Sequence, residues 1–131
     1  MRRILRTAAL IIVSYVVAAI CAAVLVLLLL DAAANMGEWL VGAILLVLIA
    51  GFVPFVIAIG VLHGIRQTGW LAHAMAGLLV SLVAVVSTGP GMLANPLSLI
   101  ENWPMLVSGA VAGLIYWLTF TTLDRIVPRP V

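Results

Sequence analysis

The stretch that decides the fold is residues 7–30, TAALIIVSYVVAAICAAVLVLLLL. It contains no Asp, Glu, Lys or Arg, and its apolar residues cover all faces of a helix rather than one stripe. A helix needs about 20 apolar residues to cross the hydrocarbon core of a bilayer. We therefore predict a transmembrane helix from Thr7 to Leu30.

Three more apolar runs follow along the chain. They extend from Trp39 to Leu62, from Trp70 to Ser87 and from Pro104 to Leu123. Of the 131 residues, 66% are hydrophobic and only 8% are charged, whereas a soluble domain is about 25% charged. Helices satisfy their own backbone hydrogen bonds in lipid. We therefore predict an all-α fold, in which residues 1–131 form one membrane domain, a four-helix bundle in up-down-up-down order.

The arginines predict the orientation of this bundle. They are Arg2, Arg3, Arg6, Arg66, Arg125 and Arg129. With four crossings all six fall on one side, and Asp31, Glu38 and Glu101 fall on the other. The positive-inside rule makes the arginine side cytoplasmic, so we expect both termini in the cytoplasm and the chain in an inner (plasma) membrane. The arginines lie at segment ends rather than in a patch, so no nucleic-acid binding is expected.

The beginning of the chain and the second outer loop carry further signals. Residues 1–34 resemble a cleaved signal peptide in their basic start and small residues, but an apolar region of about 7–15 residues is usual there. The apolar run found here is about twice as long, so we favour a retained transmembrane helix; cleavage would leave three transmembrane helices.

In the second outer loop, Asn95-Pro96 is an N-cap followed by proline, and we predict a short interfacial helix there.

Small residues at four-residue spacing recur in the predicted spans. They are Gly109 and Gly113, Gly77 and Ser81, and Gly60 and Gly64. Such pairs let helix backbones approach closely in lipid, so we expect them to mediate helix packing, either within the bundle or against another subunit. Pro54 removes a backbone donor inside the second span, and we predict a kink there.

Few residues carry catalytic or ligand-binding chemistry. His63 and His73 flank the short loop between the second and third spans, and facing each other they would suit a metal ion or a haem. No carboxylate stands nearby to orient either ring, so two interfacial histidines are the simpler interpretation and no cofactor or metal is expected. Cys21 is expected to be a packing residue. The predicted spans place Tyr15 and Tyr116 in opposite halves of the bilayer.

Three functional hypotheses follow from these features. The predicted spans lack acidic and basic residues, which argues against catalysis and against ion-coupled transport. The first hypothesis is a non-catalytic accessory or structural subunit that packs against a membrane partner in the lipid bilayer. The second is a small transporter or channel that self-associates as a homo-oligomer. The third is a haem- or metal-bearing membrane anchor that uses His63 and His73.

Overall fold

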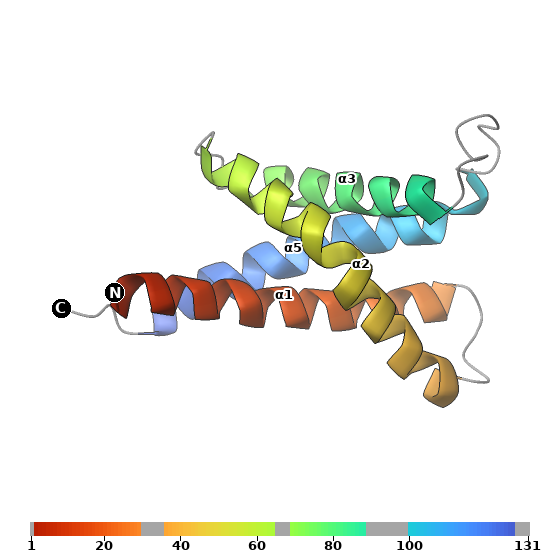
Figure 1. Cartoon of the computed structure of the whole chain (residues 1–131), viewed down its shortest axis with the longest axis horizontal. Helices are drawn as coiled ribbons and strands as arrows, with labels where there is room; N and C mark the ends of the chain where they lie inside the picture. The colour runs from red at the N-terminus through yellow and green to blue at the C-terminus, as the bar shows by residue number, and fades with distance from the viewer. Residues whose placement is uncertain (1, 30–35, 65–68, 89–99, 128–131) are drawn as a thin grey trace.

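The computed structural model describes residues 2–29, 36–64, 69–88 and 100–127. It is all-helical, as predicted, with four long helices (Figure 1). These are α1 (Arg2–Leu29), α2 (Met36–Gly64), α3 (Trp70–Thr88) and α5 (Trp103–Ile126). Asn95 and Pro96, the predicted start of the interfacial helix, lie outside the described residues; just before α5, Ile100 and Glu101 are helical.

All four helices are long and apolar enough to cross a membrane. The candidate spans are Ile4–Leu29, Leu40–Gly64, Trp70–Ser87 and Trp103–Ile126. The first and last of these extend beyond the predicted runs and include Arg6 and Asp124. Charged side chains mark where the hydrocarbon ends, but they do not end a helix, because arginine in particular is a good helix former.

The helices pack around α5. One side of α5 lies against α1 and another against α3, while α2 crosses α1 and α3 obliquely (Figure 1). The beginning of α1 and the end of α5 lie at the same end of the molecule (Figure 1). The first and last helices of the chain are therefore neighbours.

The packed core is built largely from small residues. The alanines of α1 that are at most 6% exposed are Ala18, Ala19, Ala22 and Ala23. A cluster of Ala18, Ile59, Leu62 and Tyr116 joins three of the helices. Lipid tails are as apolar as leucine, so helices in a bilayer associate mainly by close packing, and small side chains permit it.

Helix α2 is the least buried of the four. In the most apolar window of each span, 44% of the residues are buried in α1 but only 6% in α2. Large apolar side chains such as Val41, Ile49 and Val53 remain exposed along α2. Most of its surface is therefore available to lipid or to another protein.

Candidate functional site

Helices α3 and α5 meet through glycine backbones. A Cβ atom built on Gly77 would lie 2.9 Å from the amide nitrogen of Gly113 and 3.0 Å from its Cα. A Cβ built on Gly113 would lie 2.8 Å from the carbonyl carbon of His73. Real Cβ atoms essentially never approach other heavy atoms within 3.0 Å. No side chain therefore fits between these two backbones.

Ser81 and Gly109 continue the same contact. A Cβ on Gly109 would lie 2.5 Å from the Cβ of Ser81 and 2.6 Å from the carbonyl oxygen of Gly77. The Ser81 hydroxyl donates to the carbonyl oxygen of Leu78 in its own helix at 2.8 Å, a bond that satisfies its donor without help from α5. The structure thus brings together Gly77, Ser81, Gly109 and Gly113 within one chain.

Gly60 and Gly64 lie in a different environment. A Cβ at either position would meet no atom within 4 Å, and both residues are exposed. They make no close packing within the described part of the chain, so their contact with another subunit stays a prediction. Helix α2 continues as a single helix through Pro54.

The two histidines occupy unlike environments. His63 is exposed, and its Nδ1 lies 3.1 Å from the carbonyl oxygen of Ile59. His73 is only 8% exposed, and its Nδ1 lies 2.9 Å from the carbonyl oxygen of Gly69, so this nitrogen must carry the proton to donate. Among the described residues, no three His, Cys, Asp or Glu side chains group as metal ligands would. His73 is thus buried against the other helices, whereas His63 is not, and the interfacial position of both histidines stays a prediction.

A cluster of aromatic rings around Tyr116 and Phe55 joins all four helices. The ring of His73 stacks on Tyr116 of α5, with centroids 5.8 Å apart. Phe55 of α2 meets Tyr116 edge-on at 5.0 Å and Tyr15 of α1 at 4.4 Å. Phe120, one turn further along α5, stacks on Tyr116 with ring centroids 5.9 Å apart. Each such pair contributes about 0.5–1.5 kcal/mol beyond its buried area.

This cluster corrects the predicted placement of the two tyrosines. Tyr15 and Tyr116 both contact Phe55, so they lie at one level of the bundle and not in opposite halves. The sequence contained the signal, because the two residues are at similar distances from the arginine-rich ends of their helices. Antiparallel neighbours bring such positions together.

The hydroxyl group of Tyr15 connects α1 to the backbone of α2. It lies 2.9 Å from the carbonyl oxygen of Leu48 and 3.2 Å from that of Val47. A Cβ atom at Gly51 would lie 3.3 Å from this hydroxyl oxygen, which is tighter than nine in ten real contacts. The missing side chain of Gly51 therefore leaves room for the hydroxyl against the helix.

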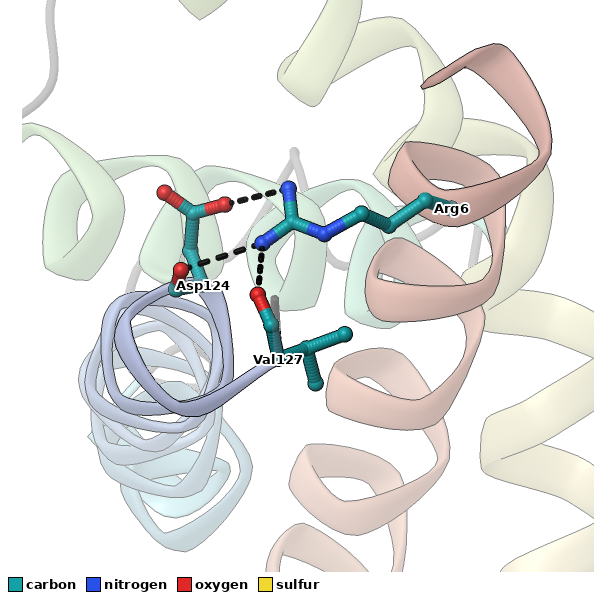
Figure 2. A network of polar contacts seen from close by, with 3 residues as sticks. All are labelled: Arg6, Asp124 and Val127. Carbon is teal, nitrogen blue, oxygen red and sulfur yellow. Dashed lines mark hydrogen bonds and ion pairs between the residues drawn. The ribbon is translucent and has the colours of Figure 1, made fainter. Parts of the chain in front are cut away.

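Arg6 ties the beginning of α1 to the end of α5 (Figure 2). Its guanidinium forms an ion pair with the Asp124 carboxylate at 2.8 Å. It also donates to the carbonyl oxygens of Asp124 at 3.0 Å and Val127 at 2.8 Å. The last carbonyls of a helix have no partner within the helix, so Arg6 acts as a cap for α5 from another helix.

Sequence reasoning assigned Arg6 to topology and did not single out Asp124. The available signal was charge: Asp124 is the one acidic residue of the sequence at the arginine-rich ends of the predicted spans. Arg125 is exposed. For Arg2 and Arg3 the structure describes the helix but not the side chains, and Arg66 and Arg129 lie outside the described residues.

Two buried hydroxyl groups have no hydrogen-bond partner among the described residues. They belong to Ser14, which is 0% exposed, and Tyr116, which is 3% exposed. A buried hydroxyl without a partner costs about 1–3 kcal/mol. One lies on α1 and the other on α5, so the packed interior contains hydroxyl groups that make no hydrogen bond to the described residues.

The four long apolar helices, in a chain with only 8% charged residues, indicate the class, a small multi-pass membrane protein. Comparisons with protein-family models, with curated proteins and with solved structures found no match to this chain. The functional argument therefore rests on the contacts described above.

Proposed function

We propose that this chain is a non-catalytic subunit of a membrane complex, which packs against a membrane partner through the exposed side of α2. In this proposal the four helices cross an inner (plasma) membrane in up-down-up-down order. Both termini are cytoplasmic in this proposal, because that orientation places the arginines on the cytoplasmic side, as the positive-inside rule requires. A short helix in the second outer loop lies at the opposite surface.

One continuous surface of α2 carries the proposal. Seven residues recur along it every three or four positions, so they share one face of the helix. We call this face the α2 stripe: Gly42, Leu45, Ile49, Val53, Val56, Gly60 and Gly64, all of which are exposed. The stripe extends along nearly the whole helix, which is the form of surface that a second membrane helix can cover.

The glycines favour a protein partner over lipid. Glycine destabilises a helix by about 1 kcal/mol relative to alanine. Contact with a lipid chain does not require glycine and so does not offset this cost, whereas close contact with another helix backbone does. Where α3 meets α5 in this same chain, Gly109 and Gly113, four residues apart on α5, allow backbone contact. Gly60 and Gly64 have the same four-residue spacing, and among the described residues no atom of another helix lies within 4 Å of a Cβ at either position.

The test is native mass spectrometry of the tagged chain, gently extracted from its own host. We expect the parent to carry a second membrane protein, and a variant with Gly60→Leu and Gly64→Leu to lose it. We expect the variant to fold, because both residues are exposed and, in the part of the chain that the structure describes, a Cβ at either position meets no atom of another helix within 4 Å. Val61→Leu is the matched control, since Val61 is exposed but lies about 100° around the helix from Gly60.

Two outcomes would contradict the proposal. If the glycine variant keeps its partner as the parent does, the α2 stripe is not the contact surface. A mass made only of copies of this chain would replace the accessory role with self-association and move the functional question to transport.

A further inference from the structure

The backbone of α2 has a weak point near its middle. Pro54 has no N–H group, so the carbonyl oxygen of Ala50 loses its normal helical donor, and the proline ring crowds that carbonyl. Gly51 lies one residue beyond Ala50 and adds conformational freedom. Bends in long helices concentrate at such combinations of proline and glycine.

The part of α2 after this point is anchored in the core. Ile59 and Leu62 are each 8% exposed and pack in one cluster with Ala18 and Tyr116. Phe55 packs against the same cluster. Any movement of this half would break contacts with two other helices.

The part of α2 before the weak point is much less tied down. Val41, Leu45 and Ile49 are 63%, 52% and 74% exposed. The Tyr15 hydroxyl reaches this half from α1, on the carbonyl oxygens of Val47 and Leu48. The hydroxyl therefore bonds to the turn immediately before Gly51 and Pro54.

We propose that Tyr15 is a latch on a hinge within α2. With the hydroxyl bonded to the backbone, the half at residues 36–50 stays in line with the anchored half. When that bond is released, the half at 36–50 pivots about the Gly51–Pro54 region, while residues 55–64 remain in the core. This movement belongs to the isolated chain and requires no partner, so it stands apart from the function proposed above.

The geometry sets the size of the movement. Val41 lies ten residues before Gly51, which is about 15 Å along a helix. A bend of about 20°, typical of a proline kink, therefore displaces Val41 by about 5 Å. A displacement of this size is within reach of distance measurements between spin labels.

The experiment measures two label pairs by pulsed electron paramagnetic resonance in a Cys21→Ala background. One pair joins Val41 to Val83 on α3, and the other joins Val61 to Met75 on α3; all four side chains are exposed. Tyr15→Phe removes only the hydroxyl. We expect the Val41–Val83 distribution to broaden or shift by about 5 Å and the Val61–Met75 distribution to stay unchanged.

A second substitution separates the hinge from general loosening. Pro54→Ala restores the donor to the Ala50 carbonyl, so adding it to Tyr15→Phe should return the Val41–Val83 distribution to that of the parent. The latch is refuted if Tyr15→Phe changes neither pair or changes both pairs alike. Failure of Pro54→Ala to restore the distribution would also overturn it, because the bend would then lie elsewhere.

Discussion

Replacing Gly113 by alanine adds one methyl group where the structure has room for none. The added Cβ would lie 2.8 Å from the carbonyl carbon of His73 and 3.1 Å from the Cα of Ala74. These are backbone atoms, which cannot rotate out of the way as the end of a long side chain can. Helices α3 and α5 must therefore separate by a substantial fraction of an ångström, and the packing on both sides of the contact weakens.

The expected loss in stability follows from two opposing terms. Overpacking a well-packed contact costs about 1–3 kcal/mol, and the rigidity of the neighbouring atoms favours the upper end. The higher helix propensity of alanine returns about 1 kcal/mol. We expect the free energy of unfolding of Gly113→Ala to fall by about 2 kcal/mol, which is roughly a 30-fold change in the unfolding equilibrium constant.

Gly60→Ala is the matched control for this measurement. The substitution is chemically identical, but no atom lies within 4 Å of the added Cβ, so only the propensity term remains. Reversible unfolding in mixed micelles, followed by tryptophan fluorescence, gives both values. If the two variants differ by less than about 0.5 kcal/mol, the α3–α5 backbone contact does not limit stability and the reasoning fails.

Three more predictions follow from the polar contacts and the charge pattern. Arg6→Ala should lower the free energy of unfolding by about 1–2 kcal/mol, because it removes the ion pair with Asp124 and the hydrogen bonds to the carbonyl oxygens at the end of α5. Arg125→Ala, at an exposed position, should change this free energy by less than about 0.5 kcal/mol, and equal effects of the two substitutions would contradict the capping role of Arg6. Tyr116→Phe should stabilise the fold by about 1 kcal/mol, and Tyr15→Phe should destabilise it by about the same amount. Of these two tyrosines, Tyr15 has a hydrogen-bond partner for its hydroxyl among the described residues and Tyr116 has none. Changes in the free energy of unfolding that have the same sign would refute this distinction. A reporter protein that is active only in the cytoplasm should be active when it is fused to either terminus. Activity at either terminus of a reporter that works only on the outer side of the membrane would contradict the predicted orientation.

The sequence was sufficient for the helices because the bilayer imposes local rules. Each span must be long and apolar by itself, so runs such as 7–30 and 39–62 can be recognised without knowing their neighbours. The helices in the structure contain these runs wherever the chain is described. The boundaries were less predictable, since the helix continues through Arg6 and Asp124 beyond the apolar residues.

The sequence was insufficient for the contacts because they join residues far apart in the chain. Arg6 and Asp124 are separated by 118 positions, and no local pattern pairs them. The same limit applied to His63 and His73, whose closeness in sequence suggested a shared site, although one is exposed and the other packs against Tyr116.

The two glycine pairs show the division most clearly. By itself the sequence determined that the chain has four long apolar helices, and that Gly60 with Gly64 and Gly109 with Gly113 lie one turn apart on their helices. Both pairs have the same local spacing, so the sequence could not distinguish their roles. Only the tertiary structure decided that α3 covers Gly109 and Gly113 while Gly60 and Gly64 remain open, because burial depends on which faces of separate helices meet.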